Sequence, residues 1–311
     1  MLGILGSGFG LYGYLPAAIE LGISQVLLPL AYKEKFISRS ELNIFDKNIV
    51  WLDSEEEIVN SASILVVARR PIDQFNSISD YLSRKQLKRI VLEKPLAPLP
   101  VHAFEILDLI KFSGKKCSAG FTFRFTHWAN FLKEKLFDSS NAKNEVLQLK
   151  WHFMAHHYGN NLNNWKKDHS QGGGVIRFYG IHVIALLAEL GYKKVIASKV
   201  GMKDRSESFS YWKAIFSGSN IPNFEVEIDS RSNSTYFWLQ NKDASNFSIK
   251  LKTPFDLPEK NKLPNDSVDI RCGYLKNVLS EVMALNEPWP NWIFDMTKLW
   301  EMVEDCTNSR A

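Results

Sequence analysis

Short apolar runs alternate with helix-like patterns over the first 120 residues of the chain. The expected strands are 2–6, 25–32, 64–68, 89–92 and 116–121, and the expected helices are 14–21, 55–61, 72–85 and 100–113. Pro29 interrupts the second strand, which argues for an edge strand or a bend there. Strands that are apolar on both faces and alternate with helices are typical of a parallel sheet covered by helices on both sides. This part of the chain is therefore predicted to be an α/β domain.

The pattern changes after residue 120, where strands dominate. A helix over 126–137 and a strand over 146–155 lead to a glycine-rich loop at 171–174 and a helix that ends near 190. Expected strands follow at 194–201, 209–217, 223–230, 235–240 and 246–251, and the closing helices are 267–285 and 292–307. Strands joined by short turns predict a large, mainly antiparallel sheet in an α+β domain. We expect domains at 1–120 and 121–311, with the last helix as the segment that could pack back on the first domain.

Composition narrows the class of protein. The 311 residues are 45% hydrophobic and 23% charged, which excludes a mostly disordered chain or a collagen-like repeat. The net charge is +4 and the basic residues are spread thinly, so a nucleic-acid partner is not expected. Cys117, Cys272 and Cys306 lie far apart without a CxxC pair. They predict neither a disulfide framework nor a zinc site, and they favour a reducing compartment.

The apolar N-terminus is similar to a signal peptide or a membrane span, because Glu20 is the one charged residue in 1–32. No basic segment precedes the apolar run, and Pro16 and several glycines interrupt it. We interpret it as a buried strand, a glycine-rich turn and a helix. The expectation is a cytoplasmic protein with no membrane partner.

The turn lies in the segment GILGSGFGLYGYLPA, residues 3–17. In dinucleotide-binding folds, a glycine-rich turn between a strand and a helix lets the backbone approach the pyrophosphate. The candidate cofactor-binding residues of this loop are Gly6, Ser7, Gly8, Phe9 and Gly10. The third position of a GxGxxG pattern counted from Gly6 is Leu11 rather than glycine. A tight turn without a ligand therefore stays open as the alternative.

An acidic residue at the tip of the second strand would bind the ribose hydroxyls of NAD. Tyr32 and Lys33 occupy that tip, and Glu34 is the nearest acid. Lys33 would tolerate a 2′-phosphate, so the sequence leans towards NADP over NAD. An ordinary surface lysine is an equally open interpretation of Lys33.

Four segments carry a resemblance to a known family. They are VLEKPLA at 91–97, GSGFGLYGYLPA at 6–17, GFTFRF at 120–125 and NWKKDHSQGGGVIRFYGIHVIALL at 164–187. In this order they resemble the Glu-Lys-Pro signature, the opening loop, the domain junction and the Gly-Gly-Gly…Gly-x-His segment of the Gfo/Idh/MocA oxidoreductases. This is the glucose–fructose oxidoreductase and inositol dehydrogenase type. The resemblance extends over essentially the whole chain.

The resemblance implies an N-terminal Rossmann domain that binds NAD or NADP. It also implies a C-terminal domain whose large open sheet binds substrate and joins subunits. The strands expected between 194 and 252 contain Trp, Phe and Tyr, and an exposed sheet face rich in these residues would be a liability. We therefore expect a homodimer or homotetramer formed through this sheet, with a small, sugar-like substrate.

The resemblance places Lys94 beside the nicotinamide and the substrate hydroxyl, and it identifies His182 as the acid/base. Removal of hydride from a secondary alcohol requires a proton to leave the oxygen, and a nearby ammonium group stabilises the developing charge. An imidazole can accept that proton near neutral pH. Pro95 favours an extended Lys94 at the end of a strand, where open α/β sheets bind ligands. The alternatives are a solvated Lys94 and a hydrogen-bonded core His182.

Further site residues follow from the same resemblance. Those expected to face the cofactor are Ala68, Arg69 and Glu93. Those expected to frame the substrate are Trp165, Lys166, Asp168, Phe178, Tyr179 and Arg124. Arg124 could instead hold the two domains together.

Three positions depart from the family's pattern. Phe178 stands where an aspartate four residues before the helix histidine is common, and Ala185 where a second acid is common. Tyr14 replaces the usual histidine of the opening loop. Either the lysine–histidine pair suffices, or Tyr179 substitutes for the aspartate, or the site has been repurposed. Phe178 also makes the expected pocket more apolar.

His152, His156 and His157 cluster near the end of an expected strand, where His152 and His156 would share a face. A metal pair is conceivable, but no cysteine or carboxylate joins them at ligand spacing. We interpret them as surface or pocket-rim histidines and expect no metal.

Three functions follow. The first is an NAD(P)-dependent oxidoreductase that transfers a hydride between nicotinamide and a sugar, sugar-nucleotide or polyol-like substrate. The second is a catalytically inactive dinucleotide- or sugar-binding protein on the same scaffold. The third keeps the cofactor and uses transient oxidation to drive elimination or glycoside cleavage. Net NADH production separates the first from the third.

Overall fold

The computed structural model describes residues 1–138, 145–202, 209–242, 247–256 and 269–308. The chain divides into two compact units. Unit 1 comprises Met1–Ala97, His102–Thr122 and Glu259–Pro290, and unit 2 comprises Pro98–Val101, Phe123–Pro258 and Asn291–Ala311.

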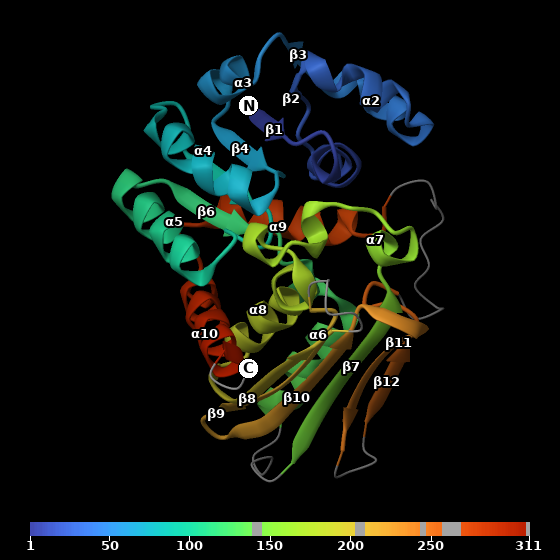
Figure 1. The fold of residues 1–311 in the computed structure, drawn as a ribbon. Coiled ribbons are helices and arrows are strands. Elements are labelled where there is room, and N and C mark those ends of the chain that lie inside the picture. The colour runs from blue at the N-terminus through green and yellow to red at the C-terminus, as the bar shows by residue number, and fades with distance from the viewer. Residues whose placement is uncertain (139–144, 203–208, 243–246, 257–268, 309–311) are drawn as a thin grey trace. The chain divides into compact units, whose positions relative to one another are not determined.

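Unit 1 is built on a six-stranded, fully parallel sheet with the strand order β3-β2-β1-β4-β5-β6 (Figure 1). Its strands are β1 (Leu2–Leu5), β2 (Val26–Pro29), β3 (Ile49–Leu52), β4 (Ile64–Val67), β5 (Arg89–Leu92) and β6 (Lys116–Ala119). Its helices include α1 (Leu15–Glu20), α2 (Lys33–Ile37), α3 (Glu55–Ser61), α4 (Pro71–Ser83), α5 (Pro100–Ser113) and α9 (Cys272–Ala284). This order is that of a doubly wound Rossmann sheet, which binds ligands where the strand order reverses, here between β1 and β4. The predicted α/β class is confirmed.

Strand β3 was missed by the sequence pattern. Its four residues, Ile49–Leu52, are a short apolar run, and all of them are half-buried at the edge of the sheet. Strand β2 ends at Pro29, and a 3₁₀ turn over Leu30–Tyr32 follows instead of more strand. Because β2 lies between β3 and β1, the bend rather than the edge accounts for Pro29.

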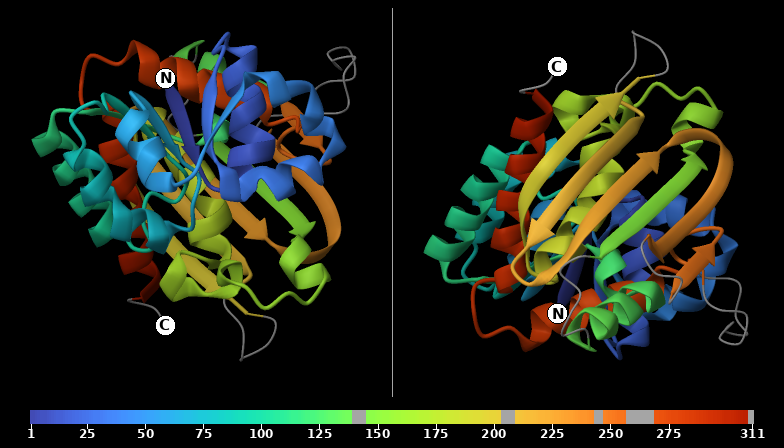
Figure 2. Two further views of the ribbon diagram at one scale, coloured as in Figure 1. Left: turned by 90° about the horizontal axis from the view of Figure 1, so that it is seen from above. Right: turned by 90° about the horizontal axis from the view of Figure 1, so that it is seen from below.

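Unit 2 contains a six-stranded mixed sheet with the order β12-β11-β7-β10-β9-β8, in which only the β7–β10 pair is parallel (Figure 2). Its strands are β7 (Val146–Met154), β8 (Tyr192–Gly201), β9 (Tyr211–Gly218), β10 (Ile221–Asp229), β11 (Arg231–Asn241) and β12 (Ser248–Leu251). Its helices include α6 (His127–Asp138), α7 (His156–Gly159), α8 (Ile181–Glu189) and α10 (Asn291–Asn308). Helix α10 packs against β8 and α8. The predicted large, mainly antiparallel sheet is confirmed.

The two faces of this sheet differ in chemistry. Burial alternates along β10: Phe224 and Val226 are fully buried, whereas Glu225 and Glu227 are half-buried on the opposite face. Aromatic side chains lie on both faces. Those that are fully buried on the inner face are Trp212, Phe216, Phe224 and Phe237. Tyr236 and Trp238 are half-buried on the outer face, which also carries paired polar groups such as Lys242 with Glu225 at 2.9 Å. A homo-oligomer formed through this sheet stays a prediction.

Helix α9 belongs to unit 1, although the sequence placed it in the second domain. Its buried apolar positions Leu275, Val278, Leu279 and Val282 pack against β5, β6 and α1. The Arg89 side chain of β5 donates a 3.0 Å hydrogen bond from Nε to the carbonyl oxygen of Val282. The sequence suggested that the last helix could pack back on the first domain. Instead α10 groups with unit 2, and the helix before it, α9, groups with unit 1.

Among the described residues, one helical stretch, His169–Glu189, is long and apolar enough by composition to cross a membrane. Of its most apolar window, 83% is buried inside the structure. That burial is the property of a core helix, and the stretch contains α8 of unit 2.

Candidate functional site

The glycine-rich loop of unit 1 lies at the carboxyl end of β1, next to the residue that follows β4. Gly6 has φ +127°, and a Cβ atom there would collide with the Ala68 carbonyl oxygen. The Ala68 N–H donates a 2.7 Å hydrogen bond to the Leu5 carbonyl oxygen. Gly8 is exposed, and a Cβ atom there would have no atom within 4 Å. The backbone at Gly8 is therefore open to a bulky anion, which fits the pyrophosphate of a dinucleotide.

Gly10 performs the packing that the sequence assigned to position 11. A Cβ atom on Gly10 would lie 2.9 Å from Cγ2 of Ile4, so glycine lets the following helical turn approach β1. Leu11 is fully buried and its N–H donates a 2.9 Å hydrogen bond to the Gly8 carbonyl oxygen. Leu11 is thus a core residue, and its presence does not argue against a ligand at the loop.

Tyr32 links this loop to a carboxylate that the sequence pattern missed. Its hydroxyl accepts a 3.0 Å hydrogen bond from the Gly6 N–H and donates a 2.7 Å bond to Oε1 of Glu55. Arg69, which follows β4, pairs with the other oxygen of Glu55. Burial, with the bond to Glu55, raises the pKa of Tyr32 to about 12. Glu55 is the first residue of α3, which begins shortly after β3. Had β3 been recognised in the sequence, Glu55 would have been a candidate at the carboxyl end of a strand.

Of the two lysines that follow β2, Lys35 rather than Lys33 bonds to the loop. Lys33 is exposed at the start of α2. Nζ of Lys35 donates a 2.8 Å hydrogen bond to Oγ of Ser7. Of the two lysines, Lys35 therefore has the better-placed charge for a phosphate at this loop.

The Glu-Lys-Pro segment follows β5 and is held from two sides. The buried Tyr14 hydroxyl donates a 2.7 Å hydrogen bond to Oε1 of Glu93. The Gln74 side chain pairs with the Glu93 backbone through two 3.0 Å hydrogen bonds. Burial raises the pKa of Glu93, and the charge of the neighbouring Lys94 acts in the opposite direction. Glu93 thus faces Tyr14. Lys94, which follows it beyond the end of β5, is half-buried.

In unit 2, His182 lies in the first turn of α8 and is 6% exposed. Its imidazole stacks on the ring of Phe123, with 4.6 Å between centroids and an interplanar angle of 18°. This stacking restricts the plane of the imidazole, which suits a group that must meet a substrate in one orientation.

The three glycines before α8 allow one loop segment to fold onto another. A Cβ atom on Gly173 would collide with the carbonyl oxygens of Trp165 and Lys166. Gly172 and Gly174 have φ values of +89° and +83°, in the left-handed region that favours glycine. The close approach fixes the 3₁₀ turn Trp165–Lys167 against the segment that leads to α8.

The structure brings three of the predicted substrate residues together. Phe178 packs edge-on against Trp165 at 5.4 Å and against Tyr179 at 4.8 Å, measured between ring centroids. The His157 ring is parallel to that of Tyr179 at 6.2 Å. Burial raises the pKa of Tyr179, which favours its neutral, hydrogen-bond-donating form, and its substitution for the aspartate stays a prediction.

Arg124 and Asp168 have structural partners instead. The Arg124 side chain is 3% exposed and binds Glu189 of α8 through Nη2 at 2.9 Å and Nε at 3.1 Å. Its guanidinium carbon lies 3.7 Å from the centroid of the Trp292 ring. Oδ1 of Asp168 accepts hydrogen bonds from the N–H and the hydroxyl of Ser170, at 2.9 and 2.7 Å. These contacts give both residues a role in shaping unit 2, and their substrate contacts stay a prediction.

A buried ion pair that the sequence did not identify anchors the same loop. Nε of Arg177 lies 2.8 Å from Oε1 of Glu304 in α10, and Nε2 of His169 lies 3.6 Å from the other oxygen. Burial acts to raise the pKa of Glu304, but the bonds from His169 and Arg177 lower it to about 2. The partners lie 127 residues apart, so no local pattern could reveal them.

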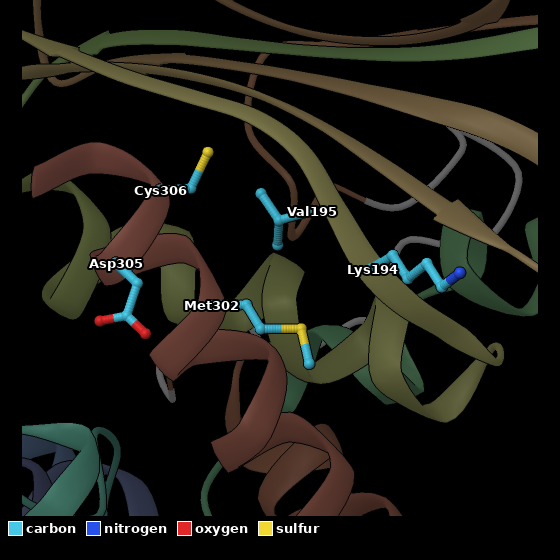
Figure 3. Close-up of a pocket in the computed structure, with 5 residues that line it drawn as sticks. All are labelled: Lys194, Val195, Met302, Asp305 and Cys306. Carbon is cyan, nitrogen blue, oxygen red and sulfur yellow. The ribbon is translucent and has the colours of Figure 1, made fainter. Parts of the chain in front are cut away.

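Two other features do not coincide with these residues. A shallow hollow between β8 and α10 is lined by Lys194, Val195, Met302, Asp305 and Cys306, none of them a predicted site residue (Figure 3). Within the described part of the chain, no group of three or more His, Cys, Asp or Glu side chains could hold a metal ion. His152 instead bonds to Glu227 at 2.9 Å and to Tyr236 at 3.1 Å on the outer sheet face.

Comparison by sequence found no protein-family model and no curated protein that matches the chain. Solved structures match it over essentially its whole length. Gal80p from Saccharomyces cerevisiae, crystallised as a super-repressor mutant, is 12% identical with a TM-score of 0.74, over 100% of this chain and 96% of that one. The WlbA dehydrogenase from Bordetella pertussis, in complex with NADH and UDP-GlcNAcA, is 13% identical with a TM-score of 0.71, over 100% and 97%.

A dehydrogenase (MviM) from Clostridium difficile is 15% identical with a TM-score of 0.69, over 99% of this chain and 98% of that one. These structural neighbours are of the Gfo/Idh/MocA type. The resemblance that the sequence motifs indicated is therefore confirmed at the level of the fold.

Proposed function

We propose that the protein is an NAD(P)-dependent oxidoreductase that acts on a CH–OH group of a sugar, sugar-nucleotide or polyol-like substrate. The open backbone at Gly8, in the loop that follows the carboxyl end of β1, is the observation that carries this proposal. A structural neighbour crystallised with NADH, the WlbA dehydrogenase, supports it. A cytoplasmic location, expected from the sequence, belongs to the same proposal.

The residues of unit 1 fit a bound dinucleotide. Gly6, Ser7, Gly8, Phe9 and Gly10 would surround the pyrophosphate, and Glu55 with Tyr32 would offer oxygen atoms to ribose hydroxyls. Lys35 at Ser7 would favour a 2′-phosphate, whereas Glu55 would oppose one. Both NAD and NADP therefore remain candidates.

When bound, the nicotinamide supplies the hydride acceptor or donor. The Lys94 ammonium would donate a hydrogen bond to the substrate oxygen and stabilise negative charge on it. The stacked imidazole of His182 would take the alcohol proton during oxidation and return it during reduction. Trp165 and Phe178 would offer aromatic surface to the substrate ring.

A second candidate function is cofactor or sugar binding without turnover. Phe178 and Ala185 in place of the family's acids favour it, and so does the likeness of the fold to Gal80p, a protein described as a repressor through its super-repressor mutant. A dinucleotide that stabilises the protein, together with no change at the nicotinamide absorbance band across a panel of sugars, would support this function.

The test is thermal unfolding with NAD⁺, NADH, NADP⁺ and NADPH in turn. A ligand at about 100 times its dissociation constant adds about 2.7 kcal/mol to the native state, which raises the unfolding midpoint measurably. Gly8→Ala is expected to unfold at the wild-type temperature without cofactor and to lose most of the cofactor-dependent rise. Gly273→Ala is the matched control, because its Cβ atom also meets open space but lies in α9.

A rise with one cofactor pair in the wild type and in Gly273→Ala, but not in Gly8→Ala, would support the proposed site. No rise with any of the four cofactors would refute it. An equal rise in Gly8→Ala would place the dinucleotide elsewhere.

A further inference from the structure

Folding brings together two basic segments that lie apart in the chain. Residues 84–89 are RKQLKR and residues 111–116 are KFSGKK, and neither segment contains an acidic residue. The first segment leads into β5 and the second into β6, which are neighbouring parallel strands of unit 1. The Lys116 N–H donates a 3.0 Å hydrogen bond to the Lys88 carbonyl oxygen. Positive charge that is spread thinly along the chain is therefore concentrated at the amino ends of these two strands.

The lysines at this place are Lys88, Lys111, Lys115 and Lys116. Within the described part of the chain, no carboxylate forms an ion pair with any of them. The ammonium groups of Lys88 and Lys116 bond instead to the carbonyl oxygens of Lys85 and Asn286. Burial, and then the charge of Lys88, lower the pKa of Lys115, which is the effect of two ammonium groups that lie close together.

Few acids lie close to these lysines. Asp108 is exposed one turn before the end of α5, and Glu287 is exposed after α9. Asp80 of α4 is bound by Arg84 at 2.7 Å, and Glu281 of α9 is bound by a serine hydroxyl of β6. The four ammonium groups therefore stand against two exposed carboxylates in the described region, and a positive surplus remains.

Apolar side chains are exposed among these lysines. Phe112 in the last turn of α5 is 86% exposed, and Leu109, three residues earlier and therefore on the same side of the helix, is 36% exposed. A scattered exposed apolar side chain is ordinary on a protein surface. Phe112, however, is flanked by lysines on both sides in the chain. We refer to Lys88, Lys111, Phe112, Lys115 and Lys116 as the lysine–phenylalanine patch.

The chemistry of the patch fits a membrane surface. Basic side chains are attracted to the headgroups of anionic lipids, and aromatic side chains favour the region between headgroups and acyl chains. Peripheral binding becomes stable when a polybasic patch and an apolar anchor act together. The phosphates of a soluble anion or a nucleic acid would engage the lysines but would offer no apolar layer to Phe112 and Leu109.

The patch is also separate from the proposed dinucleotide site. That site lies in the loop after the carboxyl end of β1, and open α/β sheets bind their ligands at the carboxyl ends of the strands. Lys88 and Lys115, by contrast, directly precede the first residues of β5 and β6. A bound cofactor therefore does not account for the lysines of the patch.

We propose that the lysine–phenylalanine patch docks unit 1 on a bilayer surface that contains anionic lipids, with the Phe112 ring among the headgroups. The lipid phosphates neutralise the lysines, and the apolar layer below them takes up the ring. Such binding is peripheral and reversible, and it weakens with salt because charges at a surface are screened. It goes beyond the proposed function and does not depend on it, since neither cofactor nor substrate takes part.

The test is co-sedimentation of the full-length protein with vesicles in the absence of cofactor. One set of vesicles is pure phosphatidylcholine, and the other contains about one-third phosphatidylglycerol, an anionic lipid. We expect partition into the anionic vesicles at about 0.1 M salt to be at least about tenfold stronger than into the neutral ones, and to be largely lost at about 1 M salt. The bound fraction as a function of lipid concentration gives the partition coefficient.

Two kinds of variant test the patch. Lys88→Gln combined with Lys115→Gln removes two charges and should weaken partition into the anionic vesicles about tenfold or more. Phe112→Ser removes the inserted ring and should weaken partition by a similar factor. Phe112→Trp should keep the wild-type partition, because tryptophan favours the same interfacial region.

Matched controls come from other surfaces of the protein. Lys193→Gln combined with Lys199→Gln removes the same charge from β8 of unit 2, and Ile44→Ser removes an apolar side chain that is 64% exposed in unit 1. Both controls should partition as the wild type does. Thermal midpoints without vesicles show whether each variant is folded.

Equal partition into neutral and anionic vesicles, or no partition into either, would overturn the proposal. So would wild-type partition by the Lys88/Lys115 variant, or an equal loss in the Lys193/Lys199 control, which would indicate attraction by net charge alone. Wild-type partition by Phe112→Ser would overturn the insertion of the ring. Binding of a single-stranded DNA oligonucleotide that the Lys88/Lys115 variant loses, without partition into vesicles, would assign the patch to nucleic acid instead.

Discussion

The Tyr14 hydroxyl and the Glu93 carboxylate form a 2.7 Å hydrogen bond in the interior of unit 1, between residues 79 positions apart. Tyr14 is fully buried and Glu93 is 8% exposed. A Cβ atom on Gly120 would collide with both groups, so the glycine after β6 provides the space for them. Tyr14, which replaces the family's opening-loop histidine, is therefore a structural partner of the Glu-Lys-Pro segment.

Removal of this hydroxyl should destabilise the protein. Tyr14→Phe removes the donor to Oε1 of the buried Glu93 carboxyl group, and we expect the free energy of unfolding to fall by about 1.5–3 kcal/mol. Tyr32→Phe is the matched comparison and should have a smaller effect, because the Glu55 side chain is 42% exposed and water can replace the phenol. Urea denaturation measures both. An equal or smaller loss in Tyr14→Phe would contradict the structural role of the pair.

Leu11 should behave as a core residue. It is fully buried, so Leu11→Ala is expected to lower the free energy of unfolding by about 2–5 kcal/mol. Leu11→Met conserves the side-chain volume and should lose less than about 1.5 kcal/mol. Chemical denaturation of both variants tests the assignment, and a neutral Leu11→Ala would speak against it.

The stability of unit 2 should depend on pH through Glu304. Its pKa in the folded protein, about 2, is below the ordinary value of 4.5. The ionised group therefore stabilises the fold above about pH 4.5, and this contribution is lost as the pH falls towards 2. We expect Glu304→Gln to reduce the free energy of unfolding by about 3 kcal/mol near neutral pH and by progressively less below pH 4.5.

Glu301→Gln is the control for this titration, because Glu301 is exposed on the same helix. Its difference from the wild type should be small at every pH. Denaturation curves measured across the acidic range give both differences. A Glu304→Gln difference that does not change with pH would show that the ion pair with Arg177 is not responsible.

Lys94→Ala tests the proposed chemistry once a substrate is found. The variant should keep the cofactor-dependent rise of the unfolding midpoint and lower the rate of hydride transfer by about 10²–10⁴. Lys85→Ala, which removes an exposed lysine of the same unit, should leave the rate unchanged. Unchanged turnover in Lys94→Ala would refute the role of this ammonium group.

Parts of the candidate site could be predicted from the sequence because they depend on local chain geometry. The turn at Gly6 requires a positive φ, and the loop at Gly172 and Gly174 requires the same, so both appear as glycines in the printed chain. Lys94 and His182 were identified by motif alone. Glu55 and the Arg177–Glu304 pair were missed, because each depends on a partner from a distant segment.

Both sheets, apart from strand β3, could be predicted from local pattern, because strands such as Ile64–Val67 and Arg89–Leu92 bury both faces and Ile221–Asp229 buries alternate residues. These are periodic properties of a few neighbouring residues. Three further features depend on tertiary packing: α9 returns to unit 1, Arg177 pairs with Glu304, and Tyr14 meets Glu93. Such choices follow from which distant segments pack together, and the packing of distant segments leaves no periodic trace in the chain.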